Sequence, residues 1–171
     1  MPPSKRAAGQ PLSLKARAVT LLAQREHSAV ELRRKLLRIA RDRDQDPSMD
    51  VDGDPVDLVD EVEAVLVWLK SSGYLEETRF VESRIHVRSQ RFGQRRIEQE
   101  LAQHGLSMNA DQRSALASGE LERACQLLRR KFGSGPATDP SDEAKRMRFL
   151  IGRGFGSDLA RKALRQVAAD A

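Results

Sequence analysis

Apolar residues recur along most of this chain at intervals of three and four positions, the spacing that places them on one face of an α-helix. The most regular of these stripes comprises Val59, Val62, Val65, Leu66 and Leu69. Neither alternating runs of β-branched residues nor an Asn-Gly hairpin signal interrupts this pattern. The sequence therefore predicts an all-α fold with about nine helices.

Residues that typically start and stop helices lie between the apolar stripes. Ser28 is followed three positions later by Glu31, the spacing of a capping box. Gly73 can take a positive φ angle and so end a helix, and Gly93 interrupts the next apolar stripe. Apart from the helix with the regular stripe, we expect helices to begin near Ser13, Ser28, Glu76, Gly93, Asp111, Glu120, Asp139 or Ser141, and Ser157 or Asp158.

One short pattern occurs three times in the chain. It consists of an aromatic residue or His, then Gly or Ser, then a small or apolar residue at each of the next two helical turns. Successive copies are offset by 65 and 63 residues. Such a period exceeds the ~20–50 residues of common solenoid repeats and suits a three-helix unit. The three copies are His27-Ser28 with Leu32 and Leu36, Phe92-Gly93 with Ile97 and Leu101, and Phe155-Gly156 with Ala160 and Leu164.

This repetition predicts three tandem three-helix, helix-turn-helix-like units. We expect the first to cover residues 13–72, the second 73–118 and the third 119–171. Residues 1–12 are rich in Pro and basic side chains, which is typical of a flexible basic arm. Within the first unit, residues 42–57 are acidic and interrupted by Pro and Gly, so we expect a loop there.

The acidic segment partly matches a calcium-binding loop. Asp50, Asp52, Asp54 and Glu61 stand at ligand positions 1, 3, 5 and 12 of the EF-hand pattern. The sixth position requires Gly for a sharp turn, but Pro55 occupies it, and proline fixes φ near −65°. We therefore favour a solvated acidic loop over a calcium site.

Composition narrows the class of protein. The chain has 171 residues, of which 32% are charged, with a formal net charge of +5. This charge permits contact with nucleic acid or with an acidic protein surface. A single cysteine is compatible with a reducing compartment, and no apolar run approaches the ~18 residues of a membrane span. Because the N-terminus also lacks a signal-peptide core, we expect a cytoplasmic protein without membrane contact, and nothing demands more than a monomer.

Residue patterns of catalysis are missing from the sequence. Neither a phosphate-binding GxxxxGK[ST] motif nor a GxGxxG fingerprint after a strand is present. His27, His86 and His104 lack metal-ligand spacing, and His27 holds the aromatic position of the repeat, which favours packing. Cys125 lies on an apolar stripe, as a buried small side chain would. We therefore predict no enzyme, no cofactor and no metal.

Basic side chains gather near the turns that precede the second and third copies of the repeat. Guanidinium groups in such positions could bind phosphates or carboxylates. For any single arginine, a solvated face with pairs such as Arg96–Glu100 is the simpler reading, but the repetition favours a binding surface. The chain has few aromatic residues to stack on bases, so sequence-specific single-strand recognition is not expected. The candidate binding residues are Arg88, Arg91, Arg95 and Arg96 at the central turn, Lys145, Arg146, Arg148 and Arg153 before the last turn, and Arg161, Lys162 and Arg165 after it.

Four segments in a fixed order resemble a known family. They are REHSAVELRRKL from Arg25 to Leu36, GYLEETRFVESRI from Gly73 to Ile85, RFGQRRIEQEL from Arg91 to Leu101, and the tail from Phe149 to Leu164. Together they resemble the bacterial regulatory protein family RecX, and the resemblance extends from about Leu14 to Val167.

The resemblance implies a fold and a function. RecX-like proteins are elongated, curved arrays of three three-helix repeats and are not enzymes. They bind in the groove of the filament that RecA forms on single-stranded DNA, and they inhibit filament growth, ATPase activity and strand exchange, which modulates recombination and DNA repair. They can also bind DNA, with duplex DNA as a further partner. The alternative function is a RecA-independent DNA-binding regulator that uses its helix-turn-helix-like units.

Overall fold

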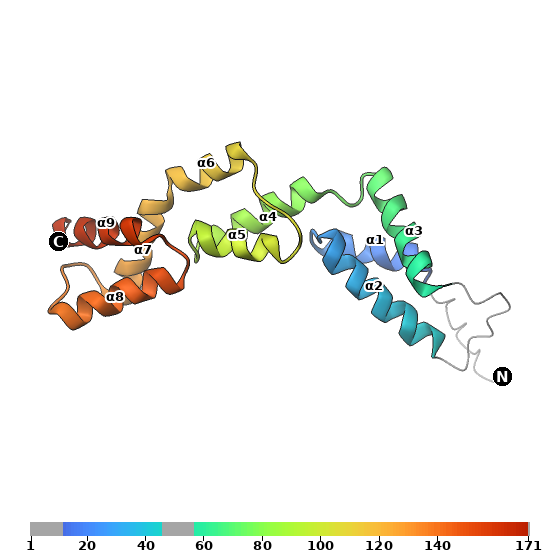
Figure 1. The fold of residues 1–171 in the computed structure, drawn as a ribbon, viewed down its shortest axis with the longest axis horizontal. Coiled ribbons are helices and arrows are strands. Elements are labelled where there is room, and N and C mark those ends of the chain that lie inside the picture. Colours follow the sequence, from blue (N-terminus) through green and yellow to red (C-terminus); the bar gives the residue numbers. More distant parts are fainter. Residues whose placement is uncertain (1–11, 46–56, 171) are drawn as a thin grey trace, which may run out of the picture. The chain divides into compact units, whose positions relative to one another are not determined.

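The computed structural model describes residues 12–45 and 57–170. All regular elements in these ranges are α-helices, which confirms the predicted all-α class (Figure 1). The predicted arm, apart from Leu12, and the calcium-like residues Asp50, Asp52, Asp54 and Pro55 lie outside the described ranges. The helices are α1 (Leu14–Gln24), α2 (Ala29–Asp44), α3 (Leu58–Ser71), α4 (Glu77–Ser89), α5 (Gln94–Ala102), α6 (Ala110–Ser118), α7 (Glu120–Phe132), α8 (Pro140–Gly152) and α9 (Ser157–Ala169).

The chain divides into two compact units, residues 1–76 and 77–171. In the first unit, α1, α2 and α3 enclose one apolar core, in which Leu32, Leu36 and Leu69 are fully buried. Leu75, which follows α3, also packs into this core. These burials explain the apolar spacing of the three helices, with one exception: Val59, the first residue of the predicted stripe on α3, is exposed.

Helix α2 continues through residues 42–44, where the acidic composition had suggested a loop, and that prediction is wrong for these three positions. The guanidinium of Arg43 binds the carboxylate of Glu61 on α3 through two hydrogen bonds of 3.1 and 2.7 Å. This pair ties the last turn of α2 to the start of α3. Tertiary contact therefore extends the helix beyond the point that composition alone indicated.

The second unit has two apolar clusters, one for each group of three helices. Phe80, Ile97 and Leu101 are buried among α4, α5 and α6. Leu128 and Leu150 are buried among α7, α8 and α9. Together with the first unit, the described residues thus form three successive three-helix groups, each with its own core, as the repeat predicted.

The repeated pattern occupies the same structural position in each group. Ser28, Gly93 and Gly156 are the N-cap residues of α2, α5 and α9. The residue before each cap packs inward: His27 and Phe155 are buried and Phe92 is half-buried. The aromatic or His position therefore serves packing at the start of a helix, as predicted for His27.

Two apolar residues of the second unit lie on exposed faces of their helices. Val87 is 62% exposed and Ile151 is 47% exposed. Val87 lies two positions after the half-buried Ile85, and Ile151 lies one position after the buried Leu150. One or two residues along an α-helix rotate a side chain away from the face that packs.

Candidate macromolecule-binding surface

Two turns of the second unit, far apart in the sequence, are joined by backbone hydrogen bonds. The amide of Gly93 donates to the carbonyl oxygen of Arg153 at 2.9 Å, and the amide of Arg95 donates to that of Gly154 at 3.2 Å. The first amides of a helix have no partner within the helix itself. The turn between α8 and α9 therefore supplies acceptors for the start of α5.

Glycine is required at both sides of this contact. A Cβ atom on Gly93 would lie 2.5 Å from the carbonyl oxygen of Gly154. A Cβ atom on Gly154, which has a φ of +89°, would lie 2.4 Å from the Cβ of Arg96. The two backbones can approach this closely only because neither residue has a side chain. We call this contact the turn junction, formed by residues 93–96 and 153–156.

A buried carboxylate completes the start of α5. Oε1 of Glu120, the first residue of α7, accepts a hydrogen bond of 2.8 Å from the amide of Gln94. Glu120 is only 7% exposed. A negative charge at this end of α5 also suits the helix dipole. The sequence predicted Glu120 as a residue of the first turn of α7 but gave no sign that it caps another helix.

The turn junction gathers guanidinium groups around the ring of Phe92. The guanidinium carbons of Arg88, Arg96 and Arg153 lie 4.1, 5.7 and 5.6 Å from the ring centroid. Arg153 also lies 4.9 Å from the centroid of Phe149 and donates a hydrogen bond of 3.2 Å to the carbonyl oxygen of Arg91. Cation–π contacts of this kind hold the arginine side chains in defined orientations.

Glu100 fixes two of these arginines from the side of α5. Its carboxylate accepts hydrogen bonds from Arg88, one of them 2.8 Å long, and from Arg96 at 3.3 Å. Burial alone would raise the pKa of the Glu100 carboxyl. The hydrogen bond and positive charge of Arg88, followed by the hydrogen bond from Arg96, outweigh burial and lower the pKa below its usual value. The predicted Arg96–Glu100 pair is therefore present, while Arg91 and Arg95 remain exposed.

The predicted residues of α8 do not all lie at the turn. Lys145 and Arg148 are exposed on the helix itself, and only Arg153 belongs to the turn junction. Arg146 is 7% exposed, and its guanidinium binds the carboxylate of Asp142 and the carbonyl oxygens of residues 135 and 136. It is engaged in anchoring the loop before α8, so we remove Arg146 from the candidate surface.

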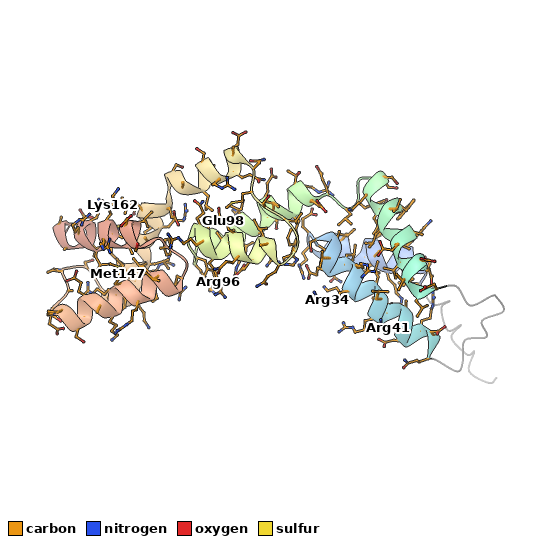
Figure 2. All side chains as sticks on the ribbon, in the orientation of Figure 1. Arg34, Arg41, Arg96, Glu98, Met147 and Lys162 are labelled. Atoms are coloured by element: carbon orange, nitrogen blue, oxygen red, sulfur yellow. The ribbon has the colours of Figure 1, made fainter. Side chains whose placement is uncertain are left out.

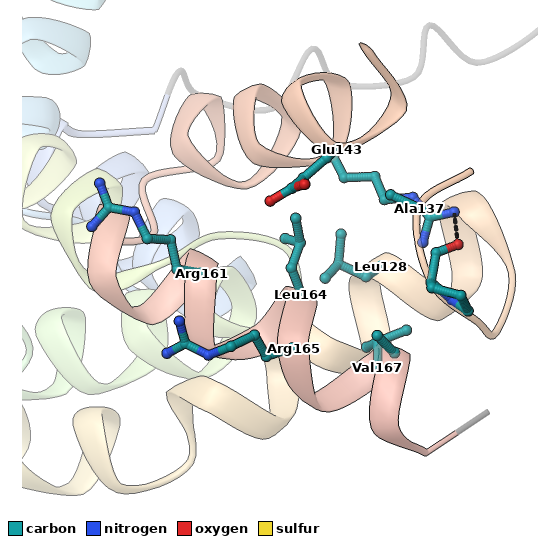
Figure 3. Close-up of a pocket in the computed structure, with 10 residues that line it drawn as sticks. Leu128, Ala137, Glu143, Arg161, Leu164, Arg165 and Val167 are labelled. Carbon is teal, nitrogen blue, oxygen red and sulfur yellow. Dashed lines mark hydrogen bonds between the residues drawn. The ribbon is translucent and has the colours of Figure 1, made fainter. Parts of the chain in front are cut away.

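Two of the three predicted residues of α9 border a separate hollow. Arg161 and Arg165, one helical turn apart, flank a hollow of about 350 Å³ between α8 and α9 whose floor includes Leu128 and Leu164 (Figure 3). Glu143 of α8 also lines this hollow. Arg161 is paired with Asp158 at 2.9 Å. Lys162 is exposed on α9 and does not line the hollow (Figure 2).

Two cations that sequence reasoning did not include lie beside the turn junction. Arg130 and Lys131, at the end of α7, line a hollow of about 300 Å³ together with Arg91, Arg153 and Phe149. Both residues lie in the last turn of α7, where a cation also suits the dipole of that helix. Their proximity to Arg91 depends on the packing of α7 against α8 and α9, for which the local pattern carries no signal.

Neither a metal centre nor a membrane span is found within the ranges that the structure covers. No group of three or more His, Cys, Asp or Glu side chains in these ranges is arranged to hold a metal ion. No described helix is both long and apolar enough to cross a membrane. What the geometry offers is a set of oriented guanidinium groups for anionic partners.

Comparison with known proteins identifies the family. The models for the second and third three-helix domains of RecX match residues 77–109 and 119–164. The regulatory protein RecX of Herbaspirillum seropedicae is 44% identical over 155 residues, which cover 90% of each chain. The chain belongs to the RecX family. RecX of Leptothrix cholodnii is 46% identical over 156 residues, covering 90% of this chain and 88% of that relative.

Solved structures agree with this family assignment at the level of the fold. The crystal structure of RecX from Lactobacillus salivarius superimposes with a TM-score of 0.61 at 16% identity, covering 90% of this chain and 94% of that one. The resemblance inferred from the sequence is thus confirmed. Because its relatives are named regulatory proteins, the chain is a RecX-type regulator.

Proposed function

We propose that this RecX-family protein binds the filament of RecA on single-stranded DNA and inhibits its ATPase activity, its extension and strand exchange. In this role it modulates recombination and DNA repair as a cytoplasmic, monomeric and non-catalytic protein that needs no cofactor. The observation that carries the proposal is the turn junction, which brings Arg95, Arg96 and Arg153 together next to Arg91. Membership of the RecX family is the reason to propose RecA as the partner.

The arrangement of these arginines supports binding to a structured anionic partner. Phe92, Phe149 and Glu100 hold several of the guanidinium groups in place before a partner arrives. A side chain that is already oriented loses less conformational entropy on binding. The oriented Arg96 and Arg153, with the exposed Arg91 and Arg95 beside them, can bind carboxylates of RecA or phosphates of the filament.

A mechanism of inhibition follows from contact with more than one RecA protomer. The second unit presents the turn junction and, on α9, the exposed cations Arg161, Lys162 and Arg165. A protein that contacts neighbouring protomers through such separate surfaces links them, and a linked protomer cannot exchange or accept the next subunit. This mechanism predicts inhibition at amounts well below that of RecA.

The direct test is the single-strand-dependent ATPase activity of RecA with this protein titrated in below the RecA concentration. We expect strong inhibition at substoichiometric amounts. Inhibition that begins only when the protein saturates the DNA would overturn the proposal. It would instead support the RecA-independent DNA-binding regulator, which also predicts tight DNA binding without RecA and a steep dependence on salt.

A further inference from the structure

A second basic surface lies on α2, in the first unit, and none of its residues belongs to the turn junction. We propose that Arg34, Arg38 and Arg41 of α2 form a track that binds the sugar–phosphate backbone of a polynucleotide, single-stranded or duplex, without reading its sequence. This inference rests on the proposed function and assigns the contact with DNA to the first unit. The turn junction of the second unit is then left for the protein component of the filament.

The three arginines share one face of the helix. Their spacings of four and three residues place them one turn apart on a single side of α2. All three are exposed, and none forms an ion pair with another residue of the described ranges. Arg34 and Arg41 can be followed along α2 in Figure 2.

The other cations of α2 are already paired, which distinguishes the track from a generally basic helix. Arg33 binds Glu63 of α3, and Arg43 binds Glu61 of α3 at 2.7 Å. Lys35 lies 2.9 Å from Nε2 of His27 and 3.7 Å from the carboxylate of Glu31. The carboxylates of α3 therefore neutralise arginines on the side that faces them and leave the track charged.

Acidic groups near the track do not cancel its charge. Glu31, which borders the same hollow as the track, is bound by Arg25 as well as by Lys35. Asp42 follows Arg38 by one turn and is exposed, but it lies beyond the 4 Å limit of an ion pair with it. Asp44, three residues after Arg41, is also exposed, and no ion pair joins it to the track. The three guanidinium groups of the track therefore stay unpaired, with the acidic side chains gathered near its Arg41 end.

The dimensions of the track suit a phosphate backbone. Arg34 and Arg41 are seven residues apart, which corresponds to about 10 Å along the helix axis. One strand of B-form DNA carries a phosphate every ~3.4 Å of its axis, so three arginines over this length can meet about three phosphates. The hollow beside them measures about 530 Å³ and contains Leu37 but no aromatic side chain that could stack on a base.

The same composition argues against a protein partner at this surface. Stable protein interfaces usually bury aromatic or apolar anchors at their centre. Leu37 is half-buried and packs against the core of its own unit, so the track presents charge without such an anchor. A surface that contacts phosphates but not bases should bind both single strands and duplexes. Its affinities for the two should differ only as far as their charge densities differ.

The test is fluorescence anisotropy of a labelled oligo-dT strand and of a mixed-sequence duplex, in the absence of RecA. We compare the wild type with Arg34→Gln/Arg41→Gln and with the control Arg33→Gln/Arg43→Gln. Both variants lose two positive charges from α2, but the control loses the paired arginines. Circular dichroism checks that both variants fold.

We expect Arg34→Gln/Arg41→Gln to weaken binding to both nucleic acids and to reduce the slope of log K against log salt by about 2, one for each phosphate contact. The control should keep the wild-type slope. Equal losses of affinity in the two variants, or no loss in either, would overturn the proposal that the track binds polynucleotides. So would weaker binding to only one of the two nucleic acids.

The RecA ATPase assay separates this inference from the proposed function. If the track variant loses affinity for polynucleotide while the wild type inhibits RecA at substoichiometric amounts, both stand. If wild-type inhibition is absent but the track variant still loses polynucleotide affinity, only the proposed function fails. If the track variant keeps its polynucleotide affinity and loses inhibition, α2 contacts protein and the inference fails.

Discussion

At the scale of single residues, His27 is held at both nitrogens of its ring. Nδ1 lies 2.8 Å from the carbonyl oxygen of Arg25, and Nε2 lies 2.9 Å from Nζ of Lys35. A neutral ring with its proton on Nδ1 satisfies both contacts, because Nε2 then accepts from the ammonium group. Burial, followed by the charges of Arg25 and Lys35, lowers the pKa of His27 despite the opposing hydrogen bond to the Arg25 carbonyl.

This arrangement predicts a loss of stability in the first unit at mildly acidic pH. The pKa of His27 is lower in the folded than in the unfolded chain, so the unfolded chain binds more protons. The stabilisation is complete above the ordinary histidine pKa of about 6.5 and is lost as pH falls through the folded value. Urea unfolding at several pH values between 8 and 5, monitored by the fluorescence of Trp68, measures this loss of stability. The signal reports on the first unit because the single tryptophan belongs to it.

His27→Phe is the matched variant, since Phe stands at the equivalent positions 92 and 155. It should remove most of the difference in unfolding free energy between pH 7.5 and 5.5. A pH profile identical to that of the wild type would show that His27 is not the group responsible.

Glu120 gives a second prediction at the residue scale. Glu120→Ala leaves the amide of Gln94 without its acceptor, and the loss of such a cap costs about 0.5–2 kcal/mol. Glu120→Gln should cost less, because the amide oxygen can still accept the bond. Chemical unfolding of the second unit, followed by far-UV circular dichroism, provides the free energies.

Glu122→Ala is the control for Glu120, because Glu122 is an exposed acid in the same first turn of α7. Its substitution should change the unfolding free energy by no more than about 0.5 kcal/mol. Equal effects of the two alanine variants would mean that capping of α5 is not what Glu120 contributes.

At the scale of elements, the contact between the α5 cap and the α8–α9 turn depends on glycine. Gly93→Ala places a methyl group against the backbone of residues 154 and 155, and overpacking of this kind typically costs about 1–3 kcal/mol. We expect a lower melting temperature in thermal unfolding and, because the junction gathers the arginines, weaker RecA inhibition.

Gly152→Ala supplies the comparison within the same segment. A Cβ atom at Gly152 would meet nothing within 4 Å, and this residue is the last of α8. The substitution should leave the melting temperature unchanged or raise it slightly, since alanine favours helix. A Gly93→Ala protein as stable as Gly152→Ala would contradict the close approach of the two turns.

Helices and their starts were predictable because their signals are local. Ser28 lies at the N-cap that its sequence context indicated, and α5 begins directly after Gly93, as expected. The N-cap of α9 is Gly156, one position before the expected Ser157. The turn junction was not predictable, because Gly93 and Gly154 show no complementary pattern and meet only through packing. Arg146 illustrates the same limit, since its spacing from Lys145 and Arg148 carries no sign that two loop carbonyls bind it.

At the scale of the whole molecule, the two units carry different kinds of basic surface. The first unit carries unpaired arginines in a row along α2, a pattern suited to a regular polymer of phosphates. The second unit carries arginines fixed by Phe92, Phe149 and Glu100, a pattern suited to one shaped partner. The central claim is that this second pattern mediates inhibition of the RecA filament.

The measurement that tests this claim most directly is substoichiometric inhibition of RecA ATPase by Arg95→Ala/Arg96→Ala. The control is Arg113→Ala/Arg129→Ala, which removes two ion-paired arginines from the same unit, bound to Glu98 and Asp170. We predict that the first variant needs at least about tenfold more protein for half-inhibition, equivalent to about 1.4 kcal/mol of binding free energy, while the control inhibits like the wild type. Full inhibition by a folded Arg95→Ala/Arg96→Ala protein would contradict the account.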